Sequence, residues 1–226
     1  TFEDVKSFYD EKLHPDKIDL ADRQVYENVF HGGKWAGIFQ FTEEGAQKFC
    51  LRAKPENVID LAAITSIYRP GPLSAGVDKD YVKAKNNPDD IEYPSPEVRE
   101  VTEETAGFLI FQEQIAELEA SHLWDTFEYF SGYGFNKSHA ISYSVLSFQC
   151  AWLLNYYPSE WVAAFLDKEP ETRKERAINI AKSLGFIIEP LNINTSGKVW
   201  EISADGKTLI QPLTSIKGLG DAAIKQ

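Results

Sequence analysis

Gly132-Tyr133-Gly134-Phe135-Asn136-Lys137-Ser138-His139 is followed by a long, mostly apolar segment that ends near Tyr156. This pattern predicts a helix with Ser138 as its N-cap, and the two glycines allow the backbone to approach a ligand closely. Four donor-bearing residues then lie at a helix N-terminus, where anions bind: Asn136, Lys137, Ser138 and His139. The alternative is an ordinary loop that ends at a capping serine.

Tyr68-Arg69-Pro70-Gly71-Pro72-Leu73 ends an earlier predicted helix. Two prolines fix the backbone just after Arg69. A rigidly held guanidinium suits the recognition of phosphate. The alternative is a plain helix stop, because proline and glycine are ordinary terminators.

Phe111-Gln112-Glu113-Gln114 has two amides on either side of a carboxylate. Gln112 and Gln114 can read the edges of bases or organise a site. The same residues are also good helix formers, so a polar helix start is the alternative.

Ile216-Lys217-Gly218-Leu219-Gly220-Asp221 alternates apolar residues and glycines before a predicted helix. The pattern resembles half of a helix-hairpin-helix unit, which grips the DNA backbone without reading sequence. Lys217, Gly218 and Gly220 are therefore candidate DNA-binding residues, and an ordinary turn is the alternative.

The composition is that of a globular protein, with 226 residues of which 43% are hydrophobic and 26% charged. The two cysteines and four histidines show no zinc-binding spacing, which fits a reducing cytoplasm. No apolar run has the length of a membrane helix, so we expect a cytoplasmic protein without a membrane partner. The chain has no methionine. Its first residue, Thr1, indicates a piece of a longer protein.

The net charge of −12 argues against an independent nucleic-acid binder. The acidity is local, however, because residues 86–125 carry one basic and eleven acidic residues. A basic groove elsewhere is compatible with this distribution. Within the acidic segment, Glu103 and Glu104 are expected on a solvated face.

The order of helical and strand patterns predicts a mainly α fold with small β elements, an α+β arrangement. Residues 1–184 are predicted to form a mostly helical core. Residues 185–226 are predicted to form a small β-hairpin region, with its turn at Asp205-Gly206, that leads into a helix-hairpin-helix.

Five segments occur in the same order in one known family, and the similarity covers nearly the whole chain. The segments are Gly37-Ile38-Phe39-Gln40-Phe41, Arg69-Pro70-Gly71-Pro72-Leu73, Gln112-Glu113-Gln114, Tyr133-Gly134-Phe135-Asn136-Lys137-Ser138-His139 and Ile216-Lys217-Gly218-Leu219-Gly220. They resemble the bacterial replicative DNA polymerase III alpha subunits, the C-family polymerases. Within that family this stretch is the fingers region, which begins after the palm and ends as the helix-hairpin-helix begins.

The resemblance implies that the parent protein is a DNA-directed DNA polymerase, a nucleotidyltransferase of chromosomal or phage DNA replication. It implies that this part binds incoming dNTP and template-primer DNA, and that two magnesium ions are held outside it. A sliding clamp and other replisome subunits would bind through other regions. The resemblance assigns nucleotide binding to Arg69, Gln112, Gln114, Asn136, Lys137, Ser138 and His139. It assigns contacts with the DNA backbone to Lys217, Gly218 and Gly220.

The sequence departs from the family in two respects. The family's Asp-x-Asp motif is absent, so no catalytic residue and no metal ligand is assigned to this chain. The family also has several dozen residues, including a basic stretch, where Ile115 here runs almost directly into Ala116-Glu117-Leu118. A chain break between residues 114 and 119 would indicate an unresolved loop. A continuous chain would indicate a natural deletion and would favour a noncatalytic helical interaction or DNA-binding module derived from the same fold.

Overall fold

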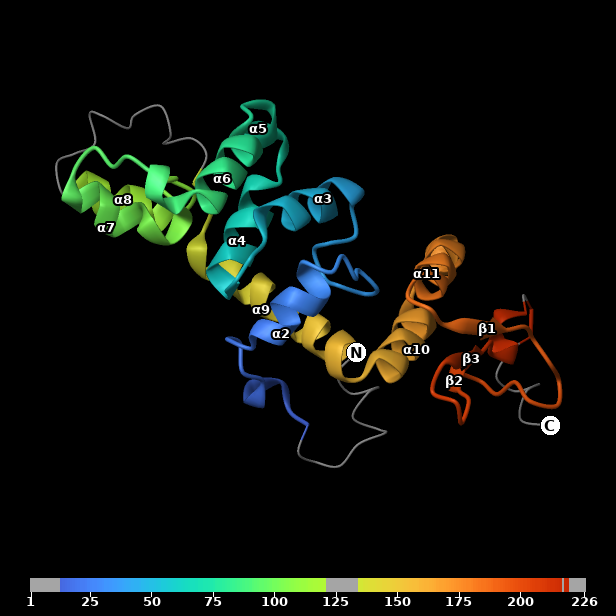
Figure 1. The fold of residues 1–226 in the computed structure, drawn as a ribbon. Coiled ribbons are helices and arrows are strands. Elements are labelled where there is room, and N and C mark those ends of the chain that lie inside the picture. Colours follow the sequence, from blue (N-terminus) through green and yellow to red (C-terminus); the bar gives the residue numbers. More distant parts are fainter. Residues whose placement is uncertain (1–12, 121–133, 217, 220–226) are drawn as a thin grey trace. The chain divides into compact units, whose positions relative to one another are not determined.

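The computed structural model describes residues 13–120, 134–216 and 218–219, which belong to two compact units (Figure 1). Among the described residues, the first unit contains 13–18, 34–37, 150–216 and 218–219, and the second contains 19–33, 38–120 and 134–149. The 20-residue helix α9 (Lys137–Tyr156) passes from the second unit into the first. Among the helices of the described residues, none has both the length and the apolar character needed to cross a membrane.

The second unit is built from short helices. Asp22 caps α2 (Arg23–Val25) by accepting a hydrogen bond from the N–H of Gln24 at 3.0 Å, and a π-helical turn, η2 (Tyr26–Phe30), follows directly. The remaining α-helices of the unit are α3 (Glu44–Ala53), α4 (Val58–Ile67), α5 (Pro70–Ser74), α6 (Val77–Asn86), α7 (Pro96–Thr102) and α8 (Gln112–Ala120). Two 3-10 turns separate them, η3 (Pro88–Asp90) and η4 (Glu103–Thr105).

The core of the second unit is aromatic. The ring centre of Tyr26 lies 4.9 Å from that of Phe148 in α9, and the ring centre of Phe30 lies 5.7 Å from that of Phe41. All four side chains are buried. Because each such ring removes roughly 150–250 Å² from water, these contacts hold the first part of α9 against η2.

The first unit contains α10 (Pro158–Lys168), α11 (Glu171–Ser183) and a three-stranded sheet. In the sheet, β3 (Thr208–Ile210) lies between β1 (Ile187–Glu189), which is parallel to it, and β2 (Glu201–Ile202), which is antiparallel. The buried Trp161 of α10 donates from Nε1 to the carbonyl oxygen of Ala36 at 2.8 Å. Two 3-10 turns, η1 (Pro15–Lys17) and η7 (Leu213–Ser215), complete the described elements of this unit.

The prediction of a mainly α fold with small β elements is confirmed. The hairpin expected around Asp205 and Gly206 corresponds to β2 and β3, which pair in antiparallel register. The division at residue 184 stays a prediction, since the two compact units group the chain differently. Lys217 and Gly220 lie outside the described residues, so the start of the expected helix-hairpin-helix is described only in part.

The place near Ile115 where the family is expected to carry several dozen further residues lies inside one helix. Residues 112–120 form α8 without a break, and the N–H of Ile115 bonds to the carbonyl oxygen of Phe111 at 3.3 Å. The residues on the two sides of this place therefore need no intervening segment to continue the helix.

Candidate functional site

The residues that precede α8 and α9 lie side by side. Phe111 and Phe135 form an isolated parallel β-bridge. The N–H of Gln112 donates to the carbonyl oxygen of Phe135 at 2.9 Å, and the N–H of Phe135 donates to that of Ile110 at 2.9 Å. Two of the predicted motifs, far apart in the sequence, therefore meet at one bridge.

Gly134 permits this close contact. A Cβ atom at residue 134 would lie 3.1 Å from Cα of Gln112 and 2.8 Å from Cδ1 of Ile115. The neighbours of Gly134 belong to the protein's own chain, and the close approach to a ligand stays a prediction. Gly132 lies outside the described residues.

The two glutamines have different environments. Gln114 is buried, and its Oε1 accepts hydrogen bonds from the N–H groups of Ile110 and Phe111, both at 3.0 Å. Its Nε2 donates to the carbonyl oxygen of Val101 at 2.9 Å and to Oγ1 of Thr105 at 2.7 Å. Gln114 therefore holds one strand of the bridge in place, whereas Gln112 is exposed.

Asn136, and not Ser138, caps α9. Oδ1 of Asn136 accepts hydrogen bonds from the N–H of His139 and from Oγ of Ser138, both at 2.8 Å. The expectation that Ser138 caps the helix is wrong, because α9 begins at Lys137, two residues before the expected first helical residue, His139. An asparagine just before the first turn satisfies an N–H that has no partner within the helix.

Two carboxylates already occupy the N-terminus of α9. Oε2 of Glu113 accepts a hydrogen bond from the backbone N–H of Lys137 at 2.8 Å. Nζ of Lys137 forms an ion pair with Oε1 of Glu104, and both side chains are about one-third exposed. Glu104 is exposed, as expected for a residue of the acidic surface, and it also pairs with Lys137. The acidity of residues 86–125 was the available signal, because carboxylates are stabilised at helix N-termini.

Arg69 joins the same group of residues. Its guanidinium carbon lies 4.5 Å from the ring centre of Phe135, and its Nε donates to the carbonyl oxygen of Ser66 at 2.7 Å. Partial burial lowers the pKa of Arg69 from its ordinary value. Pro70 begins α5 immediately afterwards, as expected for a rigidly mounted arginine.

The two cations lie on the two rings of the bridge. Arg69 stacks over Phe135, and Nζ of Lys137 lies 5.9 Å from the ring centre of Phe111. His139 is exposed, and its ring centre lies 5.5 Å from that of Phe135. Six of the seven predicted nucleotide-binding residues thus lie near this bridge and are exposed or half-buried. The seventh, Gln114, is buried and holds the bridge through its hydrogen bonds.

The predicted DNA-backbone residues are described only in part. Gly218 has a φ of +89°, a left-handed conformation that favours glycine, and no atom lies within 4 Å of the position of its absent Cβ. Lys217 and Gly220 lie outside the described residues.

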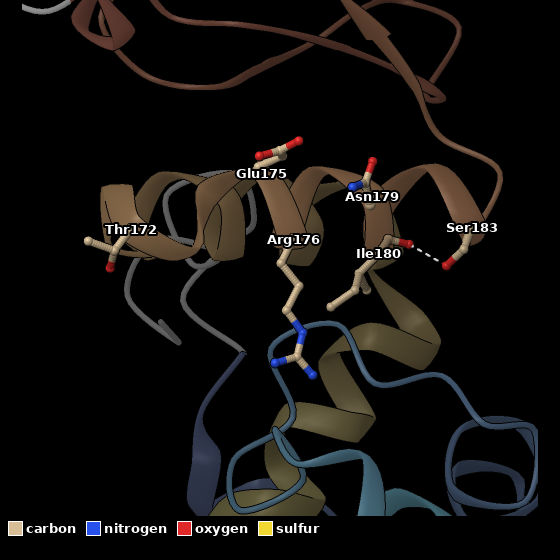
Figure 2. Close-up of a pocket in the computed structure, with 6 residues that line it drawn as sticks. All are labelled: Thr172, Glu175, Arg176, Asn179, Ile180 and Ser183. Atoms are coloured by element: carbon tan, nitrogen blue, oxygen red, sulfur yellow. Dashed lines mark hydrogen bonds between the residues drawn. The ribbon is translucent and has the colours of Figure 1, made fainter.

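Three hollows lined by described residues contain none of the predicted site residues. Figure 2 shows one along α11, about 500 Å³ in volume, where Glu175 and Arg176 point to opposite sides of the helix. A hollow of about 380 Å³ in the first unit has Lys34 and Lys207 in its lining. The third, of about 540 Å³, lies in the second unit and is mainly apolar, with Tyr68 in its lining.

Within residues 13–120, 134–216 and 218–219, no three His, Cys, Asp or Glu side chains gather in a way that could hold a metal ion. The acidic side chains nearest the candidate site, Glu104 and Glu113, each contact Lys137. The described residues therefore do not provide a donor set that fits a magnesium ion.

Residues 1–123 match the family model of the bacterial DNA polymerase III alpha subunit finger domain. The chain is 30% identical to DNA polymerase III subunit alpha of Campylobacter jejuni, over 98% of this chain and 22% of that protein. It is also 30% identical to the subunits of Aquifex aeolicus, over 92% of this chain and 22% of that protein, and of Treponema pallidum, over 90% and 21%. The chain spans about a fifth of the length of these relatives.

The alignment with the Campylobacter jejuni subunit extends over 273 residues, 47 more than the 226 of this chain. That subunit therefore carries residues within the aligned region that have no counterpart here. This difference agrees with the several dozen residues that the resemblance to the family implies to be absent.

Proposed function

This chain belongs to the finger-domain family of bacterial DNA polymerase III alpha subunits, and from that premise we propose that it binds incoming dNTP and template-primer DNA for a DNA-directed DNA polymerase. One observation carries the proposal. Arg69 and Lys137, which are 68 positions apart in the sequence, lie on the two rings of the bridge between Phe111 and Phe135.

Each residue of the site has a separate task in this proposal. Arg69 and Lys137 neutralise the triphosphate, and the N-terminus of α9 adds the partial positive charge of its N–H groups. Asn136, Ser138 and His139 supply hydrogen bonds, and Gln112 lies at the exposed edge of the bridge. Gln114 positions the bridge from below. The contribution of the chain is to orient the nucleotide and to compensate its charge, because the bond chemistry needs carboxylates that this chain lacks.

The carboxylates of Glu104 and Glu113 hold the places that phosphate oxygens would take. Both are acceptors for Lys137, one through the ammonium group and one through the backbone N–H. Nucleotide binding in this proposal is an exchange of anions, in which the triphosphate displaces one or both carboxylates. A phosphate carries more negative charge and more acceptor oxygens than a carboxylate, which favours the exchange.

The test compares dNTP binding by the chain and by the variant Lys137→Glu, measured by isothermal titration calorimetry. Lys48→Glu is the matched control, because Lys48 also forms an ion pair with one glutamate, Glu44, at 2.5 Å and makes the same charge change. We expect about tenfold weaker binding for Lys137→Glu, the scale of a lost charge-assisted hydrogen bond, and no change for Lys48→Glu. Thermal melting checks that both variants fold.

A second function, a noncatalytic helical interaction or DNA-binding module, is favoured by the residues that the chain lacks relative to its Campylobacter jejuni relative. The two functions differ in one result. A folded chain that binds no dNTP, or that binds it equally well with Glu at residue 137, supports the module and contradicts the nucleotide site. A palm domain with an Asp-x-Asp motif, encoded upstream in the same reading frame, supports the polymerase.

The wider assignments of the polymerase proposal rest on the family alone. The parent protein would act in the cytoplasm in DNA replication, with two magnesium ions held by its palm. A sliding clamp and other replisome subunits would bind outside this chain. Lys217, Gly218 and Gly220 would contact the backbone of duplex DNA at the start of a helix-hairpin-helix.

A further inference from the structure

We propose that a hollow in the first unit, with Lys34 and Lys207 in its lining, docks an acidic peptide segment of a partner protein, in which an apolar side chain is flanked by carboxylates. The hollow, called here the lysine hollow, has a volume of about 380 Å³. All residues of the candidate nucleotide site belong to the second unit. The inference therefore does not depend on the proposed function.

The start of α10 brings the segments of the lysine hollow together. The lining comes from the end of α9, the start of α10, residues 184–186, the turn between β2 and β3, and Lys34. Oγ of Ser159 donates to the carbonyl oxygen of Gly206 at 2.5 Å, which ties the turn to α10. The hydrogen bond from Trp161 to Ala36 holds the segment of Lys34 against the same helix. Two lysines 173 positions apart thus line one hollow.

Much of the lining is apolar and accessible to a ligand. Leu154 is buried, and Leu184 and Phe186 are half-buried. At Gly185 and Gly206, no atom lies within 4 Å of the position of the absent Cβ. The volume is at the lower end of the range for ligand sites, roughly 300–1,000 Å³. An apolar side chain of a peptide can therefore enter the hollow and leave water, which favours binding.

The charged side chains in the lining are positive. None of the described residues that line the hollow is an aspartate or a glutamate, although the chain has a net charge of −12. Lys137 and Lys85 form ion pairs with carboxylates, whereas Lys34 and Lys207 are exposed and form no such pair within the described part of the chain. A positive hollow in an acidic protein selects an acidic partner, because complementary charges steer association and like charges oppose it.

The hydrogen-bond donors beside the lysines favour a peptide over a nucleic acid. The N–H of Gly185 donates to the carbonyl oxygen of Lys182 at 3.0 Å, and the N–H of Lys207 donates to Oδ1 of Asp205 at 2.9 Å. Pro158, the first residue of α10, has no N–H to offer. Phosphate sites combine cations with convergent N–H groups. Two long, exposed lysine side chains can instead meet the separate carboxylates of a flexible peptide.

The experiment is an NMR titration of the isotope-labelled 226-residue chain with the peptide Asp-Asp-Phe-Asp-Asp, capped at both ends. The backbone N–H signals of Gly185, Gly206 and Lys207 report on the hollow. We expect them to shift, and we expect binding to weaken as salt is added, because exposed charges are screened. Asn-Asn-Phe-Asn-Asn lacks the charges and Asp-Asp-Gly-Asp-Asp lacks the apolar side chain. Each should bind about tenfold more weakly, through lost ion pairs or lost apolar burial.

Variants of the chain test the two lysines. Lys34→Gln and Lys207→Gln should each weaken peptide binding about twofold to fivefold, the scale of one exposed ion pair. The double variant should weaken it about tenfold, because independent contributions add in free energy. Lys182→Gln is the matched control, since Lys182 is an exposed lysine of the same unit outside the lining, and it should leave binding unchanged. Thermal melting checks that all variants fold.

Four results would overturn the proposal. The first is no shift of the three signals with the acidic peptide, and the second is equal weakening by Lys182→Gln and the two hollow variants. The third is a shift of the same signals by oligodeoxythymidine but not by the peptide, which assigns the hollow to nucleic acid. The fourth is a shift that depends on the concentration of the chain alone, which assigns it to a second copy.

Discussion

The guanidinium of Arg69 stacks on the ring of Phe135 at 4.5 Å and so connects the end of α4 with the residue that leads into α9. The ring also belongs to the bridge that holds the start of α8. A single cation–ring contact therefore links three helical elements of the second unit. Its removal is expected to affect both stability and the candidate site.

Arg69→Lys keeps the charge but loses the planar stacking and the hydrogen bond from Nε to Ser66. We expect the free energy of unfolding to fall by about 1 kcal/mol, the usual contribution of such a contact, and dNTP binding to weaken. Urea denaturation followed by circular dichroism measures the first effect. Arg99→Lys is the control, since Arg99 lies 5.6 Å from the ring centre of Tyr93 but is 60% exposed. Equal effects of the two substitutions would contradict a special role for Arg69.

Glu104→Gln removes the carboxylate that pairs with Lys137. We expect tighter binding of triphosphate, by about threefold to tenfold, because the ligand no longer competes with a charged partner. Glu103→Gln makes the same charge change at the neighbouring position, where the partner is Arg99 at 2.7 Å. Calorimetric titration with dNTP should separate the two variants. If Glu104→Gln and Glu103→Gln strengthen triphosphate binding equally, the change in net charge explains the result, and the exchange of anions at Lys137 is contradicted.

Gln114→Leu preserves the side-chain volume but removes four hydrogen bonds, two of them from backbone N–H groups of the bridge. Buried donors without acceptors are costly, so we expect a loss of about 3 kcal/mol in the free energy of unfolding. Gln112→Leu at the exposed neighbour should cost little. Chemical denaturation of both variants checks this difference, and similar stabilities would mean that Gln114 does not support the bridge.

The turn between β2 and β3 should weaken in acid. Hydrogen bonds from Oγ1 of Thr208 and from the N–H groups of Lys207 and Thr208 lower the pKa of Asp205 to about 2. Since the pKa of an aspartate in an unfolded chain is about 3.9, the stabilisation is complete above that pH and is lost as the pH falls towards 2. An NMR titration of the Asp205 carboxyl carbon measures the pKa. A midpoint near 3.9, or the same acid sensitivity in Asp205→Asn, would contradict the prediction.

The 226-residue chain by itself should not extend a primer. Phosphoryl transfer depends on metal ions that stabilise the developing charge, and the described residues contain no group of acidic side chains able to hold them. A primer-extension gel with magnesium, with a full-length bacterial DNA polymerase III alpha subunit as the positive control, tests this expectation. Extension by the chain alone would show that its metal ligands were missed.

Several features followed from local sequence. The positions of Pro70 and of the Asp205-Gly206 turn predicted the end of a helix at Arg69 and a hairpin, because each depends on the conformational limits of one or two residues. The cap of α9 was misplaced by two residues. Asn136 and Ser138 are both good caps, and local preference alone does not decide between them.

The sequence by itself determined the family, the mainly helical character and the set of chemically suitable residues, since motif order and helical spacing are properties of the chain alone. Only the tertiary structure decided their partners. Glu104 meets Lys137 and Arg69 meets Phe135 across long stretches of chain. Gln112 and Gln114, two positions apart, have opposite exposure. Contacts of this kind depend on how helices pack through a buried aromatic core, and packing in three dimensions leaves no periodic signal in the sequence.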